Sequence, residues 1–537
     1  MTNRTLIFLL FSASALAAER VTLPMGIVEG PGANAGGIRI FRGVPFAEPP
    51  VGDLRWSPPV APKKRDAVMD AGKFGNRCVQ LPLFGDMNFR NAGMSEDCLY
   101  LNIWTPAKGA KAKLPVLVYY FGGGFQAGDG SEPRYDGESM ASKGIVTVTV
   151  SYRLGVYGFL AHPELTKASP QHASGNYALM DQSAALRWVS ENIAAFGGDP
   201  KRITIAGESA GSYAVSAQMA SPLSRNLIAG AIGESGSLMG LTPPTPLAEA
   251  EAMGEKFASS LGAKTLADLK KLTTRQIYEA VDKQRTFRFP VTVDGYFLTE
   301  APVETFAAGK QARVPLLAGW NSQEQGARSV LGKDPSTLAG FKAAVERLYG
   351  AKAADVLREY TPAGDDEVEA VATALASDRF IAFGTWKWLD SHGKTSGKPT
   401  YRYYYSRPRP KMRPEMGNMT AGLAGGVIRN EGPAQPPQPP AKGAVHSAEI
   451  EYAMGNLNGN KFYAWEPDDF KVSATMEAYF ANFIKSGSPD GKGLAKWPAA
   501  NKGKDVPVMQ LDVTAKVAPE SHRGRYLLMD KIAGYSK

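Results

Sequence analysis

The chain has 537 residues, of which 44% are hydrophobic and 21% charged, which is the profile of an ordinary globular protein. Its formal net charge is +9, but the basic residues are scattered, apart from residues 63–65 and 407–413, and no basic helix is interleaved with aromatic residues. The composition therefore disfavours a nucleic-acid-binding protein. Beyond the N-terminal segment no stretch is long and apolar enough for a transmembrane helix, so we expect no integral membrane segment in the mature chain.

The N-terminus has the pattern of a cleavable secretory signal. Arg4 supplies a positive charge, residues 6–16 are mostly apolar, and Ala15-Leu16-Ala17 forms a small-x-small cleavage site. A membrane anchor is the alternative, but the apolar run is too short to span a bilayer as a helix. We expect residues 1–17 to be removed and the mature protein to be periplasmic or secreted.

Metal and disulfide chemistry is limited by the few cysteines and histidines. Only Cys78 and Cys98 are present, and two cysteines in an exported chain most often pair. They are too few for a four-cysteine zinc site, and the five histidines show no recognisable metal-binding spacing. We therefore expect no metal site.

Short apolar segments alternate with segments of helical periodicity. Helices are predicted at residues 176–196 and 212–219, and several more between 335 and 393. Predicted strands cover residues 99–104, 114–121, 144–150, 202–206, 227–232, 316–319 and 401–405. Strands that are apolar along their whole length and alternate with helices indicate a largely parallel sheet covered on both faces.

Residues 406–443 cannot form one regular element, because they contain Pro408, Pro410, Pro414 and the proline-rich run from Pro433 to Pro440. Two interpretations remain open. A long irregular segment inside a folded enzyme is often a binding loop or lid. It is otherwise a disordered surface insertion. As a loop, it is expected to shape a pocket together with Leu238 and Met239.

The motif Gly207-Glu208-Ser209-Ala210-Gly211 lies between a predicted strand and a predicted helix. A strand that turns sharply into a helix exposes the middle serine in a strained conformation, and the flanking glycines are needed because a Cβ would collide there. The free N–H groups at the helix start favour developing negative charge. A plain Gly-Ser turn is the alternative, but the strand-before, helix-after context favours a nucleophile elbow.

A serine nucleophile needs a histidine base, and three histidines follow Ser209. His522 lies in a charged tail and His392 at a predicted helix end that we expect to face water, whereas His446 has small neighbours. Spacing favours His446 without excluding the others. Three carboxylates are candidates for the supporting acid: Glu324, which closely follows a predicted strand, and its competitors Asp294 and Asp378.

The glycine triplet Gly122-Gly123-Gly124 follows the predicted strand 114–121. Backbone without side chains lets N–H groups approach a substrate oxygen, as an oxyanion hole requires. The triplet also fits a dinucleotide-binding loop loosely, but that loop must open a helix, and Gly128 to Pro133 do not. We therefore expect no nucleotide or other cofactor.

Two longer stretches resemble the type-B carboxylesterase and cholinesterase family. Its serine signature is similar to residues 196–211, F-G-G-D-P-K-R-I-T-I-A-G-E-S-A-G, and its second signature to residues 96–104, E-D-C-L-Y-L-N-I-W. The resemblance runs from about residue 22 almost to the end. It implies one domain over 18–537 with the α/β-hydrolase fold: a large, mostly parallel central sheet flanked by helices, with helical and loop insertions over the active site.

The resemblance also implies a role for individual residues. Ser209 would be the nucleophile, His446 the general base and Glu324 the acid that orients it. Further implied roles are an oxyanion hole of Gly123, Gly124 and Ala210, a supporting shell of Glu208, Ser235 and Glu449, a Cys78–Cys98 disulfide, and an Arg55–Glu96 ion pair.

The chain departs from the family pattern at three places. Phe121 stands where the family usually has His or Tyr, and Gln325 stands where a glycine usually follows the acid. The loop between the cysteines contains Phe84 and Phe89 but no tryptophan, so a choline ester is a poor candidate substrate.

These observations predict a carboxylesterase that cleaves small carboxylic esters through an acyl-enzyme. Because the base must be neutral, activity is expected to fall in acid near the ~6.5 of free histidine. Two alternatives remain: an amidase or carbamate hydrolase with the same triad, and a non-catalytic cholinesterase-like binding domain.

Overall fold

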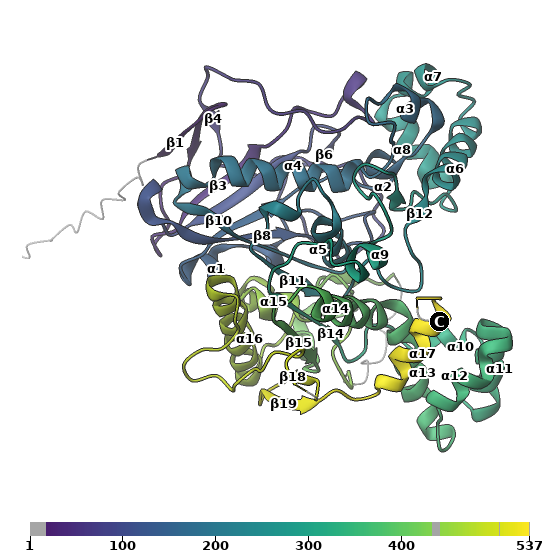
Figure 1. Ribbon diagram of the computed structural model, residues 1–537. Coiled ribbons are helices and arrows are strands. Elements are labelled where there is room, and N and C mark those ends of the chain that lie inside the picture. Colours follow the sequence, from purple (N-terminus) through teal and green to yellow (C-terminus); the bar gives the residue numbers. More distant parts are fainter. Residues whose placement is uncertain (1–17, 432–440, 504, 536–537) are drawn as a thin grey trace, which may run out of the picture.

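The computed structural model describes residues 18–431, 441–503 and 505–535 (Figure 1). The predicted signal, residues 1–17, and the proline-rich run 433–440 lie outside the described residues.

A ten-stranded sheet forms the centre of the fold (Figure 1). Neighbouring strands from β18 to β9 are parallel, whereas β3, β7 and β19 join the sheet antiparallel at its two edges. From edge to edge the strands are β19 (Lys516–Pro519), β18 (Pro507–Leu511), β15 (Thr400–Tyr405), β14 (Leu316–Asn321), β11 (Gly230–Glu234), β10 (Gly198–Glu208), β8 (Leu114–Tyr120), β9 (Val146–Val150), β7 (Tyr100–Thr105) and β3 (Arg39–Pro45).

The prediction of a largely parallel sheet is confirmed, and each of the seven predicted strands overlaps a strand of this sheet. Strand β9 is buried along its whole length, as its unbroken β-branched sequence predicts. Strand β11 begins later than predicted, because Arg225–Leu227 form a short 3₁₀ turn and pairing with Thr204 of β10 starts only at Gly230.

Helices flank the sheet (Figure 1). Helix α5 packs on β10 and β11, and α16 packs on β8 and β10. The longer helices are α4 (Tyr177–Asn192), α5 (Ala210–Ala220), α6 (Leu247–Ser260), α8 (Thr274–Lys283), α11 (Leu338–Tyr349), α13 (Val368–Ser377), α14 (Phe383–Thr395), α16 (Pro467–Ser486) and α17 (Arg523–Ile532). Shorter helices are α1 (Glu138–Ser142), α2 (Gly155–Phe159), α3 (Pro163–Ala168), α7 (Leu266–Lys271), α9 (Pro302–Ala307), α10 (Arg328–Leu331), α12 (Ala353–Glu359) and α15 (Ile450–Ala453). Within the described ranges, no helix has the length and apolar character needed to cross a bilayer.

Residues 406–431 are packed against the rest of the protein, so a disordered insertion is excluded for this part of the predicted loop. They contain an antiparallel hairpin of β16 (Met419–Ala421) and β17 (Val427–Arg429). The N–H of Gly426 donates to Asp86 Oδ2 at 3.2 Å, and a Cβ on Gly422 would lie 2.1 Å from the Asp86 carboxyl carbon. The hairpin therefore sits tightly on the loop between the two cysteines.

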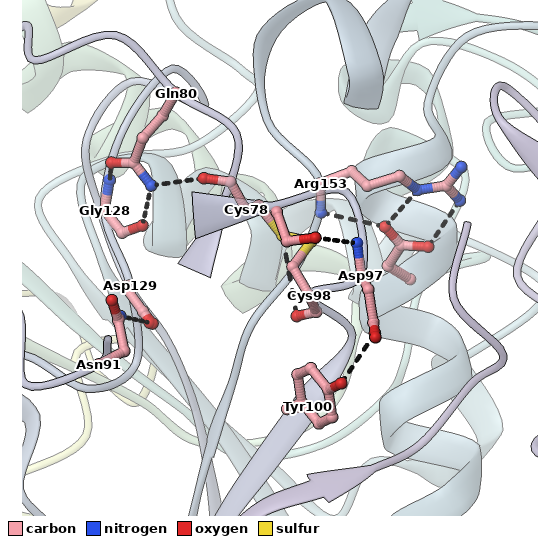
Figure 2. The surroundings of a disulfide bond; sticks show 11 residues. Cys78, Gln80, Asn91, Asp97, Cys98, Tyr100, Gly128, Asp129 and Arg153 are labelled. Atoms are coloured by element: carbon pink, nitrogen blue, oxygen red, sulfur yellow. Dashed lines mark hydrogen bonds and ion pairs between the residues drawn. A yellow bond between two sulfur atoms is a disulfide. The ribbon is translucent and has the colours of Figure 1, made fainter. Parts of the chain in front are cut away.

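Cys78 and Cys98 form a disulfide that ties this loop to the centre of the fold (Figure 2). Gln80, two residues after Cys78, makes two hydrogen bonds to the backbone of Gly128. Its Oε1 accepts from the Gly128 N–H at 2.8 Å, and its Nε2 donates to the Gly128 carbonyl at 2.9 Å (Figure 2). Gly128 lies in the glycine-rich segment that begins at Gly122, so the disulfide loop supports the backbone beside the elbow. Nearby, Arg55 and Glu96 form a buried ion pair through two hydrogen bonds of 2.6 and 2.7 Å.

Candidate active site

Ser209 occupies the sharp bend between β10, which ends at Glu208, and α5, which begins at Ala210. Its backbone has φ +54° and ψ −121°, a conformation that a non-glycine residue rarely adopts. The flanking glycines allow the bend. A Cβ on Gly207 would lie 2.5 Å from the Gly211 carbonyl carbon, and one on Gly211 would lie 2.0 Å from the Tyr120 oxygen. The local sequence therefore forms the strained turn that the motif predicts.

The structure brings Ser209, His446 and Glu324 together from distant parts of the chain. The Ser209 Oγ lies 2.9 Å from His446 Nε2, and His446 Nδ1 lies 2.6 Å from Glu324 Oε2. His446 and Glu324 are buried. This arrangement lets the imidazole accept a proton at Nε2 while a carboxylate holds the proton on Nδ1.

Glu324 is held by the groups around the end of β14. Its Oε1 accepts from the Asn321 N–H at 2.5 Å and from the Ser235 hydroxyl at 2.6 Å. Ser235 Oγ also lies 3.4 Å from Glu449 Oε1, and Glu449 accepts a hydrogen bond from the Asn321 side chain. Gln325 is exposed and does not have a positive φ, so the missing glycine at this position leaves the placement of Glu324 intact.

The two other histidines considered as bases lie elsewhere. His392 is fully buried and its Nε2 lies 2.8 Å from the Val314 carbonyl. The expectation that His392 faces water is therefore wrong, because α14 packs that end of the helix against the segment before β14. Burial lowers the pKa of His392 to about 4. His522 is exposed at the start of α17, as expected.

The two competing acids also have other partners. Asp294 accepts hydrogen bonds from the N–H groups of Tyr296 and Leu298, within its own turn. Asp378 accepts a 2.7 Å hydrogen bond from the Tyr360 hydroxyl. Of the three candidate carboxylates, Glu324 is the one that contacts His446.

Carboxylates surround the ring of His446. Glu208 Oε1 lies 3.3 Å from Nε2, on the side opposite Glu324. Burial alone lowers the pKa of His446, but the negative charges of Glu208, Glu324 and Glu449 outweigh burial and raise the pKa to about 9. Burial in turn raises the pKa of Glu208. The environment therefore favours the imidazolium form more strongly than water does.

The glycine-rich loop lies directly beside the elbow. Gly123 and Gly124 have φ of +112° and +64°, and a Cβ on Gly123 would lie 2.0 Å from the Ala127 oxygen. Ala210 is the first residue of α5, so its N–H has no acceptor within the helix. In the described part of the chain, no acceptor contacts the N–H groups of Gly123 and Gly124 either. Three N–H donors are thus free near Ser209.

The departure at Phe121 leaves this loop undisturbed. The Phe121 ring is buried and stacks on Tyr152, with 4.1 Å between ring centroids and 9° between the planes. The Tyr152 hydroxyl donates to the Phe121 carbonyl at 2.5 Å. The ring packs in the core, so an apolar side chain fits here without loss of the backbone donors.

A cavity of about 480 Å³ opens above Ser209. Its walls are mainly apolar and come from several segments, among them Phe84, Phe125, Tyr213, Phe380, Leu423 and Ala424. Leu423 and Ala424 belong to the hairpin segment, so part of residues 406–443 does shape the cavity. Leu238 and Met239 are instead buried in the core, and the expectation that they shape the pocket is wrong.

One charged residue of the cavity is not predicted from the sequence. Arg134 lines the cavity beside Glu208 and Ser209. In the sequence it stands in the segment after the glycine loop, and no local pattern marks it as part of a site. Over the described ranges, no cluster of three or more His, Cys, Asp or Glu side chains has the geometry to hold a metal ion.

Comparison with known proteins identifies relatives over nearly the whole chain. A family model described as "Carboxylesterase family" matches residues 17–527. Fumonisin B1 esterase from Sphingopyxis macrogoltabida is 35% identical, with 90% of this chain and 84% of the relative covered. Para-nitrobenzyl esterase from Bacillus subtilis is 30% identical, with 95% and 99% covered. A solved PNB esterase superposes with a TM-score of 0.78 at 27% identity, covering 95% of this chain and 99% of the other.

Proposed function

The chain belongs to the carboxylesterase family and hydrolyses carboxylic esters, and from this premise we propose that it does so through an acyl-enzyme formed on Ser209. The observation that carries the proposal is the chain of two short contacts, 2.9 Å from Ser209 Oγ to His446 Nε2 and 2.6 Å from His446 Nδ1 to Glu324 Oε2.

In the proposed mechanism the Ser209 oxygen attacks the ester carbonyl while His446 Nε2 accepts the hydroxyl proton. The negative oxygen of the tetrahedral intermediate accepts hydrogen bonds from the N–H groups of Gly123, Gly124 and Ala210. His446 then donates its proton to the leaving alcohol. Water, deprotonated by the same imidazole, attacks the acyl-enzyme and releases the acid.

The carboxylates have separate roles in this scheme. Glu324 fixes the Nδ1–H tautomer and, with Glu208, stabilises the imidazolium that forms during both steps. Ser235 and Glu449 act through other groups: Ser235 orients Glu324, and Glu449 holds the Asn321 side chain at the end of β14. Amide or carbamate cleavage by the same triad remains an alternative, to be separated by competition assays with amide, carbamate and ester substrates.

Covalent labelling tests the acyl-enzyme directly. A dialkyl fluorophosphate should attach one phosphoryl group per chain, on the peptide that contains Ser209, and should abolish hydrolysis of p-nitrophenyl butyrate. Mass spectrometry of the digested protein locates the label. Attachment to another serine with parallel loss of activity would contradict the proposal.

The raised pKa of His446 predicts the pH dependence of the reaction. Because the base must be neutral, kcat/KM should rise with pH and level off only above the pKa of His446, which lies near 9 rather than at the 6.5 expected from free histidine. Glu208 is the largest contributor among the charges that raise this pKa. Glu208→Gln should therefore shift the acid limb of the profile toward lower pH.

The measurement is kcat/KM for p-nitrophenyl butyrate as a function of pH between 5 and 9.5, for wild type and Glu208→Gln. A wild-type midpoint at or below 6.5, or an unchanged midpoint in Glu208→Gln, would show that the carboxylates do not govern the base.

We also propose that residues 1–17 are a cleaved export signal and that residues 18–537 form one domain. The continuous ten-stranded sheet, which takes strands from residue 39 to residue 519, supports a single domain. The disulfide is compatible with an oxidising compartment. N-terminal sequencing of the protein recovered from periplasm or medium tests the cleavage point.

A further inference from the structure

Arg134 is a buried cation in the wall of the ester-binding cavity. Its exposed fraction is 7%, and among the described residues that line the cavity it is the one Arg or Lys side chain. The mechanism proposed above gives it no role. A guanidinium in an apolar wall is costly unless its N–H groups are satisfied.

The ion pair of Arg134 is incomplete. Glu132 is its partner, with 3.2 Å from Nε to Oε2 and 3.4 Å from Nη2 to Oε1. Among the described residues, neither Nε nor Nη1 has a hydrogen-bond acceptor of good geometry. Burial also raises the pKa of Glu132 to about 7, although Arg134 acts in the opposite direction.

Other buried arginines of this chain have stronger pairs. Arg55 binds Glu96 through two hydrogen bonds of 2.7 and 2.6 Å, and Arg153 binds Asp181 through two of 2.8 and 2.7 Å. Arg134 has the weaker pair and leaves two buried nitrogens, Nε and Nη1, without an acceptor, whereas Arg153 leaves only Nη1. Unlike Arg55 and Arg153, Arg134 lines the substrate cavity.

We propose that Arg134 determines substrate specificity by binding a free carboxylate that the ester carries in addition to its scissile bond. This inference rests on the proposed function. A carboxylate matches the planar guanidinium and its spare N–H groups better than an alkyl group does, and in an apolar cavity such a contact is strong. Glu208 also lies near Arg134 but faces His446, so its charge is directed to the imidazole.

The carboxylate could belong to the acid part or the alcohol part of the ester, and matched probes distinguish the two. On the acid side, monoethyl adipate carries a carboxylate at the position where ethyl hexanoate carries a methyl group. The butanoyl esters of 4-hydroxybenzoate and 4-methylphenol differ in the same way on the alcohol side. For each pair the readout is the ratio of kcat/KM for the charged ester to that for the neutral ester.

Arg134→Met should lower this ratio by about tenfold to a hundredfold for one of the two pairs, mainly through KM. Arg134→Lys should retain part of the preference for the charged ester, because the positive charge remains. Arg90→Met is the matched control: it removes the same charge from an exposed arginine that pairs with Asp136, and it should leave both ratios within about twofold.

The proposal is overturned if Arg134→Met changes neither ratio by more than about twofold, or if Arg90→Met lowers a ratio equally. If Arg134→Met does not fold, the double variant Arg134→Met/Glu132→Gln removes both charges of the ion pair. The same two kcat/KM ratios, measured on this variant, then test the proposal. Failure of the wild type to hydrolyse any of the four esters would instead refute the proposed function, so the two failures are distinguishable.

Discussion

Replacing Ser209 by alanine is expected to lower kcat for p-nitrophenyl butyrate by about a million-fold. The substitution removes the oxygen that lies 2.9 Å from His446 Nε2, and no acyl-enzyme can form without it. The free N–H groups and the cavity remain, so a residual rate above that in water should persist. Stopped-flow and long-time assays of the same preparation cover the required range of rates.

Ser212→Ala is the matched control for this experiment. Ser212 lies three residues further along the chain, in α5, and its hydroxyl donates to the Gly236 carbonyl at 2.6 Å rather than to His446. Its loss should cost about 1 kcal/mol of stability and leave kcat within a few-fold of wild type. If Ser209→Ala retained more than about a hundredth of the wild-type rate, another nucleophile would have to be sought.

The strands and the elbow could be predicted from the sequence because both depend on local chemistry. An unbroken β-branched run such as Val146–Val150 is suited to a buried strand whatever its neighbours are. Likewise, Gly207 and Gly211 are required by contacts within the turn itself or with the adjacent strand. Boundaries depend on pairing, and this is why the start of β11 was misplaced.

The partners of Ser209 could not be chosen from local sequence. His446 lies 237 residues after Ser209, and Glu324 lies 122 residues before His446. Only the fold brings these residues together, so His446 and Glu324 were selected by the family resemblance. His392 illustrates the same limit: it has polar neighbours in sequence but is fully buried. Arg134 was missed because its place in the cavity depends on how its segment packs beside Glu208.

Replacing Glu324 by glutamine is expected to lower kcat by about ten-thousand-fold, the second largest effect. An amide is nearly isosteric with the carboxylate, but its NH₂ group can donate to Nδ1. The imidazole would then carry its proton on Nε2 and could not accept the proton of Ser209. The negative charge that stabilises the imidazolium is lost as well.

This tautomer argument separates Glu324 from a residue that only sets a pKa. Removing the carboxylate lowers the pKa of His446, so if the pKa alone mattered, Glu324→Gln would be active at a lower pH than wild type. We expect the loss to persist at every pH from 5 to 9.5. Asp378→Asn is the control, since this buried acid contacts Tyr360 and not His446. A larger loss in Asp378→Asn than in Glu324→Gln would show that Glu324 is not the supporting acid. The fixed Nδ1–H tautomer, and with it the base at Nε2, depends on Glu324, whose carboxylate lies 2.6 Å from Nδ1.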